Sequence, residues 1–418
     1  MNIEIVSIGD ELLLGLTIDT NAVWLGRQLA ERGVSVVRRA TVGDDVADIV
    51  AAVREALERT GAVITTGGLG PTSDDLTNRA IAAVFGRELR LDDALWEALQ
   101  LRWRELGRLG EIPEANKQQV MIPEGARVLA NRHGSAPGVF IEDERGRWVA
   151  MLPGIPREMR GLCHDELLPI VQERLGDVLR VVRSRTLRTT GVAESKLPDL
   201  LGDAARGVDG MPLAYLPGQE GVDLRLTVRD ASPEDADLRL RRGVDLLLQR
   251  VGEFAYAEER VDMAEVVLDA CRARSLTVAL AESCTGGMLG ERLTAIPGSS
   301  DVLRGGVIAY ANAVKQSALG VREATLESVG AVSEETAREM AAGARTRLAA
   351  DIGIGITGIA GPGGGTPDKP VGQVCIAVDV QGTARSFGGR LIGDRAEIRF
   401  RATQIALDMV RRALMRSG

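Results

Sequence analysis

A hydroxyl-bearing turn near residue 283 is the stretch of this sequence best suited to chemistry. An apolar run over 276–280 ends in Ser283, Thr285 and two glycines, Gly286 and Gly287, and the residues that follow have helical spacing. A hydroxyl at a strand-to-helix turn faces outward, and glycines let backbone N–H groups point at an anion or oxyanion. The pattern therefore predicts a serine nucleophile beside a site for negative charge.

The base for such a serine has to be something other than histidine. No histidine follows His164, which leaves Lys315 or Tyr310 to take the proton of Ser283. Arginine supplies nearly all of the 51 basic residues, so a retained lysine suggests a role that guanidinium cannot perform, such as accepting a proton. A lysine desolvated among apolar neighbours has a lowered pKa. A group of this type suits acyl transfer with an amide or ester substrate.

Two alternatives stay open at this turn. Cys284 is the rival nucleophile, although on extended backbone its side chain would point to the face opposite that of Ser283. The other alternative is a glycine-rich structural core in which the serine is a buried cap.

Further donors follow later in the chain. Thr357 ends an apolar run and leads into a glycine-rich loop that includes Gly358 and Gly361. The hydroxyl and N–H groups there suit a carbonyl or a phosphate. Arg395 and Arg399 are four residues apart on one predicted helix face, so either is placed to clamp a phosphate.

A second candidate site lies in the first half of the sequence. Strands and helices alternate there at intervals typical of a doubly wound parallel sheet, in which ligands bind at the carboxyl ends of the strands. Asp10 follows the first strand, and a loop over 67–75 follows the third. Successive N–H groups before a helix favour phosphate, and the loop's carboxylates would repel it unless a divalent cation lies between them. The loop residues of interest are Gly67, Gly68, Gly70, Pro71, Thr72, Asp74 and Asp75.

This loop also has a simpler interpretation, a glycine turn with an aspartate helix cap. In the functional interpretation, Asp10, Asp74 and Asp75 bind the metal. Asn21 and Lys117 are then expected to contact a nucleotide beside the glycines.

The length, composition and net charge of the chain limit the classes of protein to which it can belong. A chain of 418 residues predicts two or three domains, and no apolar run approaches the roughly 20 residues of a membrane span. The amino terminus lacks the pattern of a signal peptide, and the four cysteines show no zinc or disulfide spacing. We therefore expect a cytoplasmic protein with no membrane partner. The net charge of −8 argues against nucleic acid as the main partner.

The residue pattern of the sequence changes at two points, which predicts three domains. A doubly wound α/β domain is expected over 1–168 and a small α+β module over 169–253, with an arginine-rich strand over 178–190. An α/β domain carrying the Ser283 turn is expected over 254–418.

The whole chain resembles the competence/damage-inducible CinA family. Its third domain resembles nicotinamide-mononucleotide amidohydrolases in the stretches 281–287, 306–312 and 355–364 and in Lys315. The resemblance implies hydrolysis of the carboxamide of nicotinamide mononucleotide, without a cofactor. It implies that Ser283 attacks, that Lys315 and Tyr310 handle its proton, and that Ser300, Thr357 and Arg399 hold substrate.

The stretch 66–77 resembles the molybdopterin-binding fold. In CinA proteins that domain is associated with ADP-ribose pyrophosphatase activity, which implies a divalent metal ion (Mg, Mn or Co), possibly with K. The middle module resembles the family's KH-like domain, and the family is expected to form homodimers. A rival hypothesis is a pterin- or nucleotide-binding regulatory protein of competence or DNA damage that turns nothing over.

Overall fold

The computed structural model describes residues 1–105, 107, 110–176 and 180–416. These residues form two compact units, Met1–Arg183 with Val228–Leu238 and Ser184–Thr227 with Arg239–Gly418. Among the described residues, no helix has both the length and the apolar character needed to cross a bilayer.

The first unit is built on a six-stranded sheet of order β2-β1-β3-β8-β7-β6. The strands β2, β1, β3 and β8 are parallel to their neighbours, whereas β7 and β6 form an antiparallel edge. The run of buried residues along β1 and β3 is typical of a parallel sheet covered on both faces. The strands span Asn2–Ile8 (β1), Ser35–Val42 (β2), Ala62–Thr66 (β3), Arg127–Leu129 (β6), Gly138–Glu142 (β7) and Trp148–Leu152 (β8).

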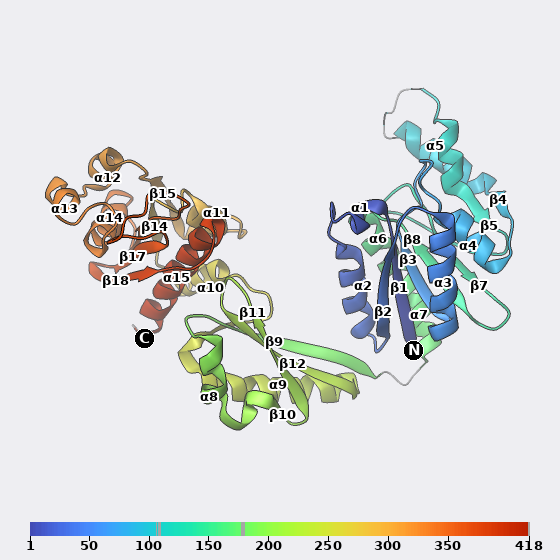
Figure 1. Cartoon of the computed structure of the whole chain (residues 1–418), viewed down its shortest axis with the longest axis horizontal. Helices are drawn as coiled ribbons and strands as arrows, with labels where there is room; N and C mark the ends of the chain where they lie inside the picture. Colours follow the sequence, from blue (N-terminus) through green and yellow to red (C-terminus); the bar gives the residue numbers. More distant parts are fainter. Residues whose placement is uncertain (106, 108–109, 177–179, 417–418) are drawn as a thin grey trace. The chain divides into compact units, whose positions relative to one another are not determined.

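Helices cover both faces of this sheet (Figure 1). Ile3 and Ile5 point into a core with α2, α6 and α7, whereas Val6 and Ile8 point into a core with α3 and α4. The sheet is therefore doubly wound, as the alternation of elements predicted. The helices span Asp10–Leu13 (α1), Thr20–Ala30 (α2), Val46–Thr60 (α3), Thr77–Phe85 (α4), Asp93–Glu105 (α5), Pro156–Leu162 (α6) and Leu168–Leu175 (α7), and a two-stranded sheet joins Leu89–Leu91 (β4) to Met121–Pro123 (β5).

The middle module is a five-stranded sheet of order β10-β11-β12-β9-β13 with two α-helices. Its arginine-rich strand β9 begins at Val181, and residues 178 and 179 of the predicted strand lie outside the described residues. The elements span Val181–Thr189 (β9), Leu197–Leu201 (α8), Gly207–Val208 (β10), Met211–Pro217 (β11), Val222–Ala231 (β12), Pro233–Val251 (α9) and Ala255–Glu258 (β13).

The carboxyl-terminal domain has a five-stranded sheet of order β15-β14-β16-β17-β18. β14 lies at the centre of its three parallel strands, so its carboxyl end opens onto the loops that follow β15 and β16. The strands span Val278–Glu282 (β14), Leu303–Ile308 (β15), Ile352–Gly358 (β16), Gln373–Val380 (β17) and Thr383–Arg390 (β18). The helices span Met263–Arg272 (α10), Met288–Thr294 (α11), Asn312–Leu319 (α12), Glu323–Ser328 (α13), Glu334–Arg347 (α14) and Arg395–Met415 (α15).

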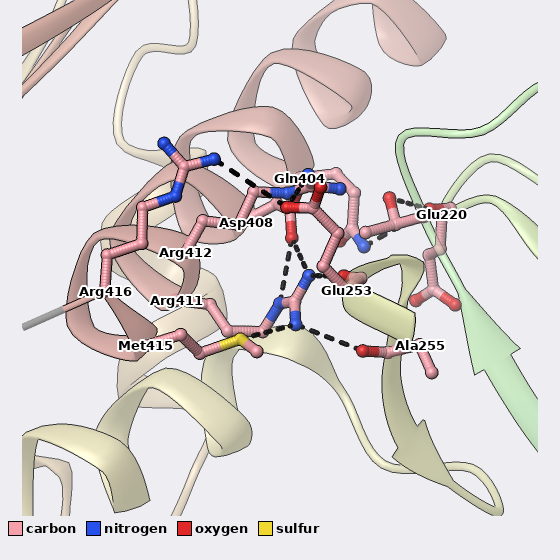
Figure 2. A network of polar contacts seen from close by, with 10 residues as sticks. Glu220, Glu253, Ala255, Gln404, Asp408, Arg411, Arg412, Met415 and Arg416 are labelled. Carbon is pink, nitrogen blue, oxygen red and sulfur yellow. Dashed lines mark hydrogen bonds and ion pairs between the residues drawn. The ribbon is translucent and has the colours of Figure 1, made fainter. Parts of the chain in front are cut away.

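The last helix, α15, joins this domain to the middle module (Figure 2). Arg411 donates to the backbone carbonyls of Glu253 (2.6 Å) and Ala255 (3.1 Å), and its charge is balanced by Asp408 at 2.6 Å. Arg412 lies 2.7 Å from the Glu253 carboxylate. Because Arg411 and Asp408 are themselves buried, this joint is part of the interior and not a surface contact.

Candidate functional site

The structure brings Ser283 and Lys315 together at the carboxyl end of β14. Ser283 is the residue after the strand, and Lys315 lies one turn into α12. The Lys315 Nζ donates to Ser283 Oγ at 3.1 Å and to the backbone carbonyls of Ala309 (2.8 Å) and Tyr310 (3.2 Å). These three acceptors engage all three protons of the ammonium group, so the position of the nitrogen is fixed by the fold.

Lys315 is buried without a carboxylate partner. Its side chain is 1% exposed, and no ion pair joins it to an acidic residue among the described residues. Burial disfavours the charged ammonium, so the pKa of Lys315 lies below its ordinary value of 10.5. A buried lysine that more readily gives up its proton, 3.1 Å from a serine oxygen, has the properties of a general base.

A cavity of about 270 Å³ opens beside this pair. Arg395 lies at its wall, where it donates to the Gly361 carbonyl at 2.6 Å and to the Tyr310 hydroxyl at 3.2 Å. Tyr310 thus contacts Lys315 through its carbonyl oxygen and Arg395 through its hydroxyl. The lining residues are Ser283, Cys284, Tyr310, Asn312, Lys315, Ala331, Val332, Thr357, Gly358, Ile359, Ala360, Gly361, Gly363, Gly364 and Arg395.

Several predicted substrate contacts lie outside this lining. Arg399 donates to the backbone carbonyl of Thr285 at 2.7 Å, so it braces the nucleophile turn. Ser300 is exposed in a short 3-10 helix, and it does not line the cavity. Thr357 does line it, although its hydroxyl is already bonded to the Ala331 carbonyl at 2.7 Å.

The glycines of the turn allow its backbone conformation. Gly286 and Gly287 have φ of 57° and 97°, values that favour glycine. Their N–H groups donate within the protein, that of Gly286 to the Ser283 carbonyl and that of Gly287 to the Glu282 carboxylate. Among the described residues, the N–H groups of Cys284 and Thr285 are the ones in this turn that donate to no other residue.

Cys284 lines the same cavity, but its thiol is poorly suited to attack. Burial raises the pKa of the Cys284 thiol to about 12, so the reactive thiolate is scarce at neutral pH. Ser283 is the group that contacts the lysine. The geometry therefore favours serine over cysteine as the nucleophile.

The first unit has its own cavity, of about 430 Å³, at the carboxyl ends of β1 and β3. The lining includes the predicted Asn21, Gly67, Gly68, Gly70, Pro71, Asp74 and Asp75, together with Glu11, Asp44, Gln119, Ser135 and Glu158, which sequence reasoning missed. Asn21 donates to the Gly154 carbonyl at 2.7 Å, and its own side-chain oxygen has no partner among the described residues. Lys117 lies elsewhere, paired with Glu114 at 2.6 Å over the Trp96 ring.

The predicted metal ligands are distributed differently from what the sequence suggested. Asp75 accepts from the N–H and hydroxyl of Thr72, which makes it a loop brace. Asp10 and Asp44 cap each other's backbone N–H groups, and Asp44 faces the cavity. Burial raises the pKa of Asp44, and the charges of Asp10, Glu11 and Asp74 raise it further.

These carboxylates suit a divalent cation that takes its remaining coordinating oxygens from a bound phosphate ligand and from water. No three acidic, histidine or cysteine side chains among the described residues converge closely enough to hold a metal alone. Magnesium typically uses one or two carboxylates and takes the remaining oxygens from substrate phosphates and water. Asp44 and Asp74 are the residues whose repulsion such an ion would relieve.

Comparisons with known proteins cover the whole chain. Family models match residues 4–173 (probable molybdopterin binding domain), 184–257 (damage-inducible protein CinA KH domain) and 260–414 (CinA C-terminal domain). The chain is 59% identical to a CinA-like protein of Gemmatimonas aurantiaca over 100% of its own length and 97% of that protein. It is 41% identical to a CinA-like protein of Chlorobaculum tepidum over 97% of both.

A solved competence/damage-inducible protein of Agrobacterium tumefaciens is 41% identical, with a TM-score of 0.36, and covers 37% of this chain and 93% of its own. The family models and the curated relatives confirm the predicted resemblance and the multidomain α/β fold class. This chain belongs to the CinA family, with a molybdopterin-binding-type domain, a KH domain and a CinA C-terminal domain.

Proposed function

We propose that the carboxyl-terminal domain hydrolyses the carboxamide of nicotinamide mononucleotide to nicotinate mononucleotide and ammonia. The observation that carries the proposal is the buried Lys315 ammonium nitrogen, 3.1 Å from Ser283 Oγ and without an acidic partner. A structural lysine would be expected to pair with a carboxylate, because an unpaired buried charge is costly. For a lysine that serves as a base, the same burial is useful because it favours the neutral amine, which can accept a proton.

The reaction follows from these positions. Neutral Lys315 Nζ takes the proton of Ser283 Oγ as that oxygen attacks the amide carbon. The N–H groups of Cys284 and Thr285, which donate to no other residue, are proposed to stabilise the oxyanion that forms. The C–N bond then breaks, Lys315 returns the proton to the departing nitrogen, and ammonia leaves an acyl ester on Ser283. Water attacks that ester as Lys315 takes its proton, the acyl C–O bond to Ser283 breaks, and Lys315 returns the proton to Ser283 Oγ as the carboxylic acid leaves.

Arg395 is proposed to bind the substrate's phosphate. Its two hydrogen bonds, to Gly361 and Tyr310, fix the guanidinium at the cavity wall, and its planar fork matches phosphate oxygens. Tyr310 is 63% exposed and is therefore available to the substrate through its ring. The glycine loop beside Arg395 allows the ligand to approach the backbone closely.

Arg395→Ala is expected to raise KM for nicotinamide mononucleotide about 10- to 100-fold, the loss of one charged hydrogen-bond donor. The chemical step should change little, because Arg395 contacts neither Ser283 nor Lys315. Steady-state kinetics on the mononucleotide and on nicotinamide riboside, which lacks the phosphate, measure this effect. An equal loss on both substrates would show that Arg395 does not bind the phosphate.

The test of the proposed activity is ammonia release from nicotinamide mononucleotide by the purified chain. Nicotinate mononucleotide formed in equal amount would support the proposal. If the purified chain binds the mononucleotide and leaves it intact, the domain is a sensor and the catalytic proposal fails.

We further propose that the first unit hydrolyses the diphosphate of ADP-ribose. The support is a cavity large enough for a nucleotide, lined by several glycines and by Asp44 and Asp74. A divalent cation held by these two carboxylates would neutralise the diphosphate and activate water. Binding of ADP-ribose without turnover, across Mg, Mn and Co, would favour the regulatory alternative.

Asp44→Asn is expected to lower metal-dependent hydrolysis of ADP-ribose by at least about 10- to 100-fold, the loss seen even for outer-shell partners. The metal concentration for half-maximal rate should rise, because one anionic ligand is gone. AMP release against metal concentration measures both. Asp48→Asn, an exposed change in the first turn of α3, is the matched control and should leave the curve unchanged.

Small molecules are proposed as the partners of this chain, with a homodimer in the cytoplasm. Both Gly-x-x-Gly runs of the middle module, 207–210 and 218–221, carry an acidic residue, Asp209 and Glu220. KH domains use such a loop to clamp nucleic-acid backbone. Here the Glu220 carboxylate pairs with Arg188 and the Asp209 carboxylate with Arg239, so these arginines are already engaged. The Glu220 carbonyl is also engaged by Thr190 and Gln404. These features support the absence of a nucleic-acid partner.

A further inference from the structure

Glu282, the residue immediately before the nucleophile, has a buried carboxylate that the proposed reaction does not use. Its side chain is 3% exposed at the end of β14. No arginine or lysine pairs with it among the described residues. A charge taken out of water in this way needs several hydrogen bonds to persist.

Three backbone N–H groups supply those bonds. The carboxylate of Glu282 accepts from Gly287 (3.0 Å) and Leu289 (3.1 Å) on one oxygen and from Gly290 (2.9 Å) on the other. These are the first amides of α11, which in other helices are left to a cap or to solvent. The side chain thus bridges from the end of the strand to the start of the helix, and the residues between, 283–286, form a closed turn.

The main chain of Glu282 supports the base as well. Its carbonyl accepts from the Ala309 N–H at 2.7 Å, and the Ala309 carbonyl in turn accepts from Lys315 Nζ at 2.8 Å. One residue therefore anchors both the turn that carries the serine and the strand end that holds the lysine. Its side chain controls only the first of these, which makes the two separable by mutation.

We propose that Glu282 is a positioning residue, whose carboxylate holds Ser283 Oγ at attacking distance and angle. The inference rests on the proposed amidohydrolase function for its kinetic consequence. Misplacement of a reacting group by about 1 Å can cost about 100-fold in rate.

The sharpest variant is Glu282→Gln, which keeps the size of the side chain. It replaces one acceptor oxygen by an NH₂ donor that faces an N–H donor, so at least one of the three bonds is lost. We expect kcat on nicotinamide mononucleotide to fall about 100-fold while KM stays within about threefold. The ascending limb of the pH–rate profile should stay in place, because Lys315 and its contacts are untouched.

Glu291→Gln is the matched control. It makes the same change on α11, the helix whose first amides Glu282 binds, but its side chain is exposed, so kinetics should remain at the parent level. Glu282→Asp keeps the charge with one methylene less reach, and it should lose less kcat than Glu282→Gln. It also serves if the glutamine variant fails to fold. A kcat for Glu282→Gln within about threefold of the parent would overturn the proposal.

A second readout does not depend on turnover. Deuterium uptake of a peptide covering 283–290 should be slow at Gly287, Leu289 and Gly290 in the parent and at least about tenfold faster in Glu282→Gln. Equal uptake would contradict the role of Glu282 even in a chain that hydrolyses nothing. A parent without ammonia release would refute the proposed function, and the exchange data would still decide on the turn.

Discussion

Lys315→Met is expected to abolish ammonia release from nicotinamide mononucleotide and at the same time to stabilise the protein. General bases contribute about 10²- to 10⁴-fold, so the loss should be at least about 10³-fold with the nucleophile left unactivated. Methionine has a similar length and no charge to bury. The free energy of unfolding at pH 7 should rise, because the desolvation penalty of the ammonium disappears.

The pH dependence has a definite sign. The folded-state pKa of Lys315 is lowered, so between that value and 10.5 the unfolded chain binds more protons than the folded one. The parent therefore gains stability as the pH rises through this window, and below the window it carries the full penalty. The advantage of Lys315→Met should be constant at low pH and shrink as the pH approaches 10.5.

Activity follows the same group in the same direction. The rate of the parent should rise with pH up to the lowered pKa of Lys315 and then level off, because only the neutral amine accepts a proton. Urea unfolding at several pH values and a pH–rate profile measure the two effects. Lys196→Met, at an exposed lysine of the middle module, should change neither. A variant that is inactive and also less stable would contradict the burial argument.

The second large effect is expected at the adjacent pair Ser283 and Cys284. Ser283→Ala should reduce deamidation at least about 10⁴-fold, because the nucleophile of a covalent mechanism cannot be replaced by its neighbours. Cys284→Ala should keep most of the rate, since the Cys284 thiol has a pKa near 12 and makes no contact with Lys315. Ammonia release and, for the parent, trapping of an acyl-enzyme by mass spectrometry measure these outcomes.

The reverse result would be informative. Activity that survives Ser283→Ala and is lost in Cys284→Ala would move the attack to the thiol. Activity that survives both changes would assign the attack to water, with Lys315 as base for it.

Much of this fold could be predicted from the sequence because its signals are local. The alternation of apolar runs with amphipathic stretches identified the doubly wound sheet, and the glycine turns marked the carboxyl ends of its strands. The proximity of Ser283 and Lys315 was predictable for a related reason. Both follow strands that neighbour each other in a parallel sheet, so their loops meet at one edge.

The remaining features depend on where side chains point after packing. Arg395 and Arg399 share one helix face, and only the docking of α15 decides that the first lines the cavity and the second bonds the Thr285 carbonyl. Of the two glycine amides expected to bind an anion, that of Gly286 is taken by the Ser283 carbonyl. That of Gly287 is taken by the carboxylate of Glu282, which the sequence presents merely as the last residue of a strand. Asp44 was missed because its loop carries no glycine-rich signal, although it lines the same cavity as Asp74.

The joint at α15 has a consequence for how this protein can be divided. A fragment beginning at residue 260 keeps Arg411 and Asp408 but loses the carbonyls of Glu253 and Ala255 that the guanidinium serves. The N–H groups of Arg411 that donate to these carbonyls would then have to bind water. The excised domain would therefore expose polar groups that are buried in the intact chain. The carboxyl-terminal domain is accordingly expected to unfold in one cooperative step with the parts of the middle module that belong to its compact unit, 184–227 and 239–258.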